Sequence, residues 1–286
     1  MQFALTEDQI AVRDMAREFA AEKIAPFAQK WDEEKFFPVD VMREAAALGM
    51  GGIYIRDDVG GSALTRFDAA LIFEALATGC PTVSSFISIH NMASWMIDRF
   101  GSDAQRQKWL PQVALGDPLC AIAVTEPDTG SDVAAMRLKA SKCDGGWILD
   151  GVKTWCTMAG KAGLLLVLAR SNPDRSLGHR GLSMFLVEKD SYEGHDFEYR
   201  QVQGGVLTGR AISTIGYRGM HSYEVFFDNV FVPDENLVGG PAGEGKGFYF
   251  TMAGFAGGRI QTAARAIGVM QAAFERAVSY SQERKA

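Results

Sequence analysis

The spacing of apolar residues changes twice along this chain of 286 residues, and those two changes limit the folds that it can adopt. Up to about residue 118 the apolar residues recur with the period of a helix. They then fall into short runs separated by turn residues, as in strands, before the helical period returns. The pattern predicts a multidomain α+β protein: an N-terminal all-α domain (1–118), a middle β-barrel or β-sandwich domain (119–236), and a C-terminal helical segment (242–286).

Local signals predict where several of these elements lie. The segments Thr6-Glu7-Asp8-Gln9 and Ser102-Asp103-Ala104-Gln105 are capping boxes, so a helix should begin at each of them. Turn residues at Asp144-Gly145-Gly146 predict a hairpin between two strands. Further helices are expected near 38–49, 68–79 and 82–100, and further strands at 164–169, 183–187, 212–215 and 224–232.

The composition excludes several classes of protein. A net charge of −6 argues against nucleic acid as the main partner, because phosphate binding needs a basic face. No apolar run is long enough for a transmembrane helix, and the N-terminus lacks the pattern of a signal peptide, so a cytoplasmic protein is expected. The four cysteines and four histidines are scattered without the spacing of metal ligands, so no metal site is expected.

One short motif suggests a different class of site. The stretch "GPAGEGKG", Gly240–Gly247, matches the spacing of a phosphate-binding P-loop. However, Gly247 stands where a P-loop has the Ser or Thr that holds magnesium, and no alternating strand–helix pattern surrounds the motif. A Gly-rich connection into a helix is therefore favoured over a P-loop nucleotidase.

Three further segments together carry a resemblance to a known family. They are "AVTEPDTGSD" (123–132), "GVKTWCTMAGKA" (151–162) and "GRIQTAARAIG" (258–268), followed by the terminal "SQERKA". Together they resemble the acyl-CoA dehydrogenases, over the whole chain and in the same order. The fold of that family implies that residues 242–286 are the start of a C-terminal helical bundle domain. The resemblance implies an FAD-dependent α,β-dehydrogenation of an acyl-CoA thioester, electron transfer to an electron-transferring flavoprotein, and a homotetramer. The segment at 88–101 is similar to short- and branched-chain members of the isobutyryl-CoA type, and 258–269 also to methylsuccinyl-CoA enzymes.

The same resemblance assigns roles around the flavin. It implies that Val124 and Thr125 face the polar edge of the flavin ring, that Trp155 packs beside the ring, and that Thr157 bonds near its N5 atom. Ser131 is implied to lie near the cofactor pyrophosphate or the acyl-CoA. Without the resemblance, a Trp in a strand more often belongs to the core, and a Thr there reflects β-propensity. The acids Glu126 and Asp132 are expected to cap turns or helix N-termini.

Two arginines and one glycine complete the implied site. Arg259 corresponds to an arginine near the adenine side of CoA, and Arg284 to one that reaches the FAD pyrophosphate of a neighbouring subunit. Arg284 could equally be a surface partner of an acid. Gly258 stands where some members carry the catalytic Glu, and most members carry it in a later helix, so no catalytic residue is assigned in this chain. The chain is expected to be a C-terminally truncated enzyme without its base; the alternative is a non-catalytic flavin- or CoA-binding relative of the same fold.

Overall fold

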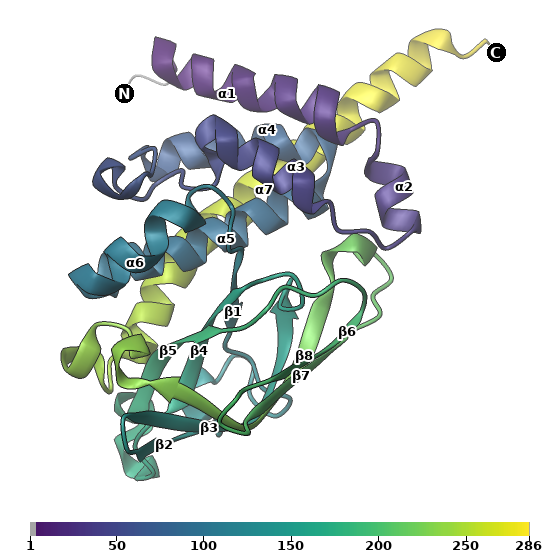
Figure 1. The fold of residues 1–286 in the computed structure, drawn as a ribbon. Coiled ribbons are helices and arrows are strands. Elements are labelled where there is room, and N and C mark those ends of the chain that lie inside the picture. The colour runs from purple at the N-terminus through teal and green to yellow at the C-terminus, as the bar shows by residue number, and fades with distance from the viewer. Residues whose placement is uncertain (1–3, 286) are drawn as a thin grey trace.

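The computed structural model describes residues 4–285, which form a group of helices packed on a curled β-sheet (Figure 1). No helix among these residues is long and apolar enough to cross a membrane. The helices are α1 (Glu7–Phe19), α2 (Ala28–Glu33), α3 (Val39–Ala45), α4 (Arg66–Gly79), α5 (Pro81–Phe100), α6 (Asp103–Val113) and, after the sheet, α7 (Gly247–Glu283).

Capping boxes begin three of these helices. The two expected from the sequence are confirmed, because Thr6 accepts a hydrogen bond from the Gln9 amide and Ser102 from the Gln105 amide. The third, formed by Thr65 and Asp68 at the start of α4, was not singled out from the sequence. Helix α2 was missed as well: it has only six residues, too few to display a helical period.

The sheet has eight strands: β1 (Cys120–Ala123), β2 (Lys139–Cys143), β3 (Gly146–Thr157), β4 (Leu164–Arg170), β5 (Leu182–Glu188), β6 (Asp196–Arg200), β7 (Val206–Ala211) and β8 (Ser222–Pro233). Their order is β1-β4-β2-β3-β8-β7-β6, and β5 pairs with β4. The fold class expected from the sequence is confirmed, as is the hairpin, now β2 and β3. The strand expected at 212–215 is wrong: this segment is irregular, and Ile215 is fully exposed, so its apolar side chain has no core to face. Strands β6 and β7 were not predicted.

Strands β1 and β2 share one edge of β4. Strand β5 pairs with β4 along its whole length from Leu164 to Arg170, which occupies the other edge. Strand β1 pairs with the first four residues of β4, and β2 joins it only at Arg170. The segment 124–138 therefore leaves the sheet after β1 and returns to the same edge as β2. We call this segment the excursion loop.

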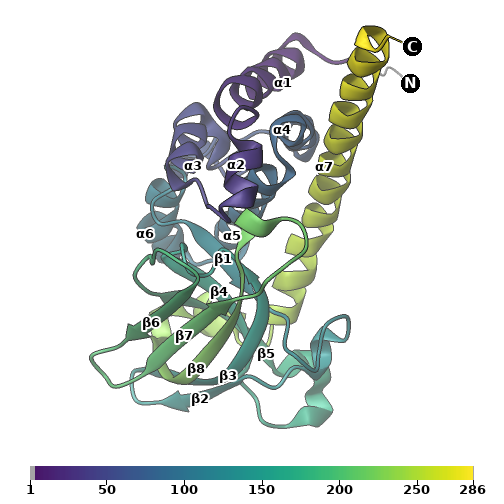
Figure 2. The same cartoon turned by 90° about the vertical axis from the view of Figure 1, so that its right-hand side faces the viewer.

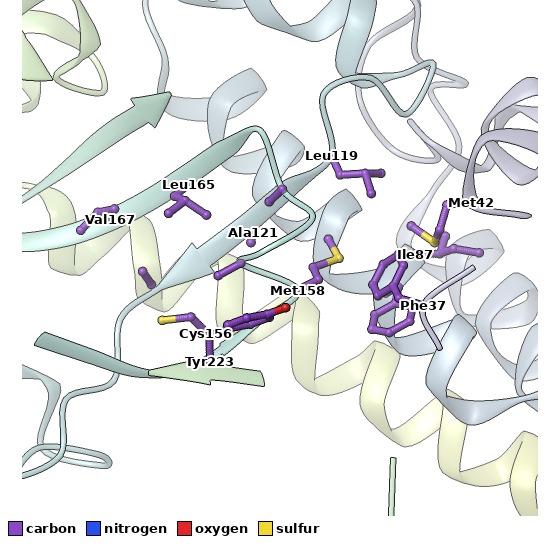
Figure 3. Packing of buried hydrophobic residues seen from close by; sticks show 14 of the residues in the cluster. Phe37, Met42, Ile87, Leu119, Ala121, Cys156, Met158, Leu165, Val167 and Tyr223 are labelled. Atoms are coloured by element: carbon purple, nitrogen blue, oxygen red, sulfur yellow. The ribbon is translucent and has the colours of Figure 1, made fainter. Parts of the chain in front are cut away.

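The helices and the sheet share one core. Phe37, between α2 and α3, and Ile87 on α5 lie close to Leu119 and Met158 from the sheet region (Figure 3), and all four belong to the largest cluster of buried apolar residues. Helix α7 runs along one side of the molecule, from the sheet past α5 and α4 (Figure 2). The close contact with α4 needs a small residue, because a Cβ at Gly268 would lie 2.1 Å from the Glu74 carbonyl oxygen.

A buried histidine connects three elements where the helices meet the sheet. The Cys120 amide at the start of β1 donates to His90 Nδ1 (3.0 Å), so His90 Nε2 carries the proton and donates to the Val113 carbonyl at the end of α6 (2.9 Å). His90 on α5 is 1% exposed, and burial lowers its pKa to about 4. Both ring nitrogens are used only by the neutral ring, so protonation would break this connection.

The depressed pKa of His90 predicts a loss of stability in mild acid. The unfolded chain binds the proton near pH 6.5 and the folded chain only near pH 4, so stability falls as the pH drops between these values. We expect the wild type to lose about 3 kcal/mol of unfolding free energy over this interval that His90→Gln does not lose, because glutamine preserves a donor and an acceptor without titrating. Urea unfolding of both proteins at several pH values measures this difference. Parallel pH dependences would contradict it.

Candidate functional site

A buried ion pair organises the excursion loop. Lys153 on β3 is 0% exposed, and its Nζ donates to Glu126 Oε1 (2.9 Å) and to the Val124 carbonyl (2.9 Å). Burial lowers the pKa of Lys153, and the charge of Glu126 acts against that shift. Glu126 also accepts from the Arg137 amide (2.6 Å) and the Leu138 amide (2.8 Å). One carboxylate thus joins the outgoing and returning ends of the loop to β3. Glu126 is therefore structural, but the amides that it accepts from lie in the extended segment before β2, so it does not cap a turn or a helix N-terminus as expected.

A buried arginine holds the returning half of the loop. Arg170, at the end of β4, donates through its guanidinium to the carbonyls of Met136 (3.1 Å), Ala134 (2.7 Å) and Gly178 (3.2 Å). Its own amide donates to the Leu138 carbonyl (2.8 Å). Because these are main-chain acceptors, they fix the path of the loop whatever side chains it carries.

Three of the residues implied to contact the flavin occupy one region of the sheet. The Thr154 amide donates to the Thr125 carbonyl (2.8 Å), which places the start of the loop beside β3. The pairing of β3 with β8 is irregular between Lys153 and Cys156, and Trp155 at this irregularity has a φ of 57°. Its indole is 55% exposed and does not belong to the core, unlike most tryptophans in strands. Thr157 lies two residues further along β3, and its hydroxyl oxygen is 3.2 Å from the Ser222 hydroxyl oxygen.

The other loop residues singled out from the sequence differ in their surroundings. The Val124 side chain is buried in a small apolar cluster with Val133 and Leu168, while its carbonyl binds Lys153. Ser131 is exposed on the loop. Asp132 precedes a short 3₁₀ turn but makes no capping bond with its side chain, so the cap expected there is not formed.

A groove between α5 and α7 brings together residues far apart in sequence. Its volume is about 360 Å³, and its lining residues are Ser85, Ser88, Ile89, Met92, Phe255, Gly258, Arg259, Gln261, Thr262 and Arg265. Gly258 and Arg259 are the two that the sequence singled out, and the hydroxyl, amide and second guanidinium groups were missed. No carboxylate occurs among these lining residues. Thr262 and Arg265 follow Gly258 at helical spacing, which is the signal that could have found them.

Two sequence motifs lie outside this region. Arg284 follows the last turn of α7, at the end of that helix remote from the sheet, so within one chain it does not join Thr125 or Trp155 (Figure 1). The Gly240–Gly247 segment packs against β5: the Gly245 amide donates to the Ser183 hydroxyl (2.9 Å), and a Cβ at Gly247 would lie 2.5 Å from Ser183. It serves as a close-packed connection into α7.

The ion pair predicts a large asymmetry between two lysine substitutions. Lys153→Met should cost about 3–5 kcal/mol of unfolding free energy, because it leaves the Glu126 carboxylate buried without its cationic partner. Lys142→Met is the control: the Lys142–Asp234 pair is closer (2.6 Å against 2.9 Å for the buried pair), but both side chains are about half exposed, so its removal should cost less than about 1 kcal/mol. Denaturant unfolding of both variants measures this. Equal losses would show that the buried pair does not stabilise the loop.

Comparison with known proteins follows the same division of the chain. Residues 6–117 match the acyl-CoA dehydrogenase N-terminal domain, residues 121–230 the middle domain, and residues 245–286 the C-terminal domain. The chain is 40% identical, over 98% of its length, to the mitochondrial isobutyryl-CoA dehydrogenase of Dictyostelium discoideum, and spans 64% of that protein. It is 39% identical over 98% of its length to the (2S)-methylsuccinyl-CoA dehydrogenase of Cereibacter sphaeroides, of which it spans 50%.

Other relatives are matched over more of their own length. An acyl-CoA dehydrogenase of Bacillus subtilis is 33% identical over 98% of this chain, which spans 70% of it. The glutaryl-CoA dehydrogenase structure in complex with glutaryl-CoA superposes with a TM-score of 0.89 at 30% identity, covering 100% of this chain and 69% of that one. Butyryl-CoA dehydrogenase of Megasphaera elsdenii gives 0.88 at 30% identity, with coverages of 100% and 72%. On its sequence and its fold, the chain belongs to the acyl-CoA dehydrogenase family.

Proposed function

We propose that this chain is the FAD- and substrate-binding part of an acyl-CoA dehydrogenase that acts on a short or branched acyl-CoA. The observation that supports this most is the exposed indole of Trp155, displayed at an irregularity of β3 beside a loop that a buried ion pair holds in place. An exposed, conformationally restricted tryptophan beside hydroxyl groups is suited to a flat, polar-edged ring system.

The residues around Trp155 fit the requirements of FAD. The indole provides a flat apolar wall for the ring, and the hydroxyls of Thr125 and Thr157 provide neutral donors for its polar edge. FAD supplies the hydride acceptor of an α,β-dehydrogenation. The chain's own contribution is to orient the ring with fixed dipoles, which need no rearrangement during the reaction. The anchored main chain of Val124 and Thr125 is suited to that purpose.

The groove between α5 and α7 is the proposed acyl site. Arg259 at its edge is assigned to the CoA side, and the exposed Ser131 to the phosphates of FAD or CoA. The isobutyryl-CoA and methylsuccinyl-CoA dehydrogenases among the relatives suggest a short, branched acyl group. Removal of the α-proton needs a base, and Gly258 offers none. Glu126 is excluded from that role, because it already binds Lys153 and two amides.

Helix α7 is the proposed surface for self-association into a homotetramer. The electrons taken from the substrate would pass to an electron-transferring flavoprotein. Between residues 260 and 280 it exposes a series of large apolar side chains: Ile260, Ile267, Val269, Met270, Phe274, Val278 and Tyr280. Such a series on one helix is typical of a surface that another element covers. Arg284 at the end of α7 would then meet the FAD of a neighbouring subunit.

The flavin assignment predicts a specific loss of FAD affinity. Trp155→Ala should weaken FAD binding by about 2 kcal/mol, roughly 30-fold in Kd, because the wall beside the ring is lost. Trp155→Phe should retain most of the affinity. Phe67→Ala is the control, because Phe67 on α4 is as exposed as Trp155 (54% against 55%) but lies outside the proposed site. Quenching of flavin fluorescence on titration measures Kd. If the wild type does not bind FAD, or Trp155→Ala binds it normally, the proposed function is wrong.

Self-association through α7 has its own prediction. Phe274→Glu places a charge in the exposed apolar series (Phe274 is 66% exposed) and should shift the protein from oligomer to monomer. Ser279→Glu adds the same charge to another side of the helix and should leave assembly intact. Sedimentation velocity at several concentrations distinguishes the species. A wild type that remains monomeric at high concentration would rule out the proposed interface.

A further inference from the structure

The groove between α5 and α7 has a polar end and an apolar end. At the apolar end Gly258 faces Met92, since a Cβ at Gly258 would lie 2.7 Å from the Met92 sulfur. At the other end Arg265 faces Ser88, with Nη1 3.2 Å from the Ser88 hydroxyl. Gly258, Thr262 and Arg265 lie on one side of α7, and Arg265 is two turns, or about 10 Å, beyond Gly258.

The guanidinium at the polar end has little to bind within the chain. An arginine carries five N–H donors, and for Arg265 the hydrogen bond to Ser88 is the only one among residues 4–285. No acid among these residues forms an ion pair with it, and no acid lines the groove. The Ser88 hydroxyl donates to the Ser85 carbonyl (2.8 Å) and accepts the bond from Arg265 as a neutral group, so it does not compensate the charge of the guanidinium. Arg265 is nevertheless half-buried between two helices.

A half-buried cation with one neutral partner favours an anion in the groove. A guanidinium binds a carboxylate through two parallel hydrogen bonds, which is the geometry that its fork of donors matches best. The hydroxyls of Ser85 and Thr262 line the same groove and could donate to the same group. A branched hydrocarbon would instead leave four donors without partners while removing water from them, which is costly.

We propose that Arg265 is a specificity residue that binds a free carboxylate at the far end of the acyl group, so that the preferred substrate is the CoA thioester of a dicarboxylic acid. This inference rests on the proposed function, because it takes the groove as the acyl site with the thioester toward Gly258. It narrows the range of substrates in that function. The acyl chain must be short, because its carboxylate has to reach a guanidinium that is only two turns of α7 beyond Gly258.

Two thioesters of similar shape test this directly. Succinyl-CoA ends in a carboxylate, and 4-methylpentanoyl-CoA carries an uncharged isopropyl group in its place. Isothermal titration calorimetry with the FAD-loaded, full-length protein measures both dissociation constants. We expect the wild type to bind succinyl-CoA at least about 10-fold more tightly, as a hydrogen-bonded charged group typically contributes.

Variants at Arg265 assign that preference to one side chain. Arg265→Gln should weaken succinyl-CoA binding by about 10- to 100-fold and change 4-methylpentanoyl-CoA binding by less than about threefold. The affinity of Arg265→Lys for succinyl-CoA should lie between those of the wild type and Arg265→Gln, because lysine keeps the charge but not the forked pair of donors. Arg276→Gln, on the same side of α7 three turns further on, is the control and should bind both thioesters as the wild type does.

Each other result overturns the inference in a distinguishable way. If Arg265→Gln weakens both thioesters equally, Arg265 supports the wall of the groove and does not select a carboxylate. If the wild type prefers 4-methylpentanoyl-CoA, the groove is an acyl site for hydrocarbon chains, and only the proposed function survives. If neither thioester binds although FAD does, the groove is not the acyl site, and the substrate part of the proposed function falls with the inference.

Discussion

The buried pair between Lys153 and Glu126 is the interaction on which the candidate site depends. A charged lysine without solvent exposure is costly to bury unless its three donors are used, and here the partners are the Glu126 carboxylate, the Val124 carbonyl and the Met136 sulfur. The same carboxylate accepts two amides from the returning end of the loop. Loop and strand are therefore joined at the point where the strand becomes irregular and presents Trp155. Loss of the ion pair would therefore free the excursion loop and the irregular part of β3 together.

Local features were predictable from the sequence, and long-range ones were not. A capping box such as Thr6–Gln9 is complete within four residues, so its helix could be placed before any tertiary contact was known. Lys153 and Glu126 are 27 residues apart, and nothing in either neighbourhood marks them as partners. The segment 212–215 illustrates the opposite error: its alternating pattern suggests a strand, but the pairing with β8 is made by β7.

The residues of the candidate site were likewise predictable from the sequence only in part. Thr125, Trp155 and Thr157 were found through a family resemblance, and the physical reason for their grouping, the irregular pairing of β3, appears only in the fold. The groove between α5 and α7 joins Ser88 to Arg265 across 177 residues. Spacing within α7 could have indicated that Gly258, Thr262 and Arg265 share a face, but not which helix lies opposite.

The course of the excursion loop has a consequence for how such a site can diverge. Because β1 and β2 occupy the same edge of β4, the sheet continues as though the loop between them were absent. An insertion or deletion within the loop would not shift the pairing of any strand, since both ends are anchored by main-chain acceptors and one carboxylate. The loop can therefore behave as an exchangeable module, so that new recognition chemistry can evolve there without refolding the sheet that carries it.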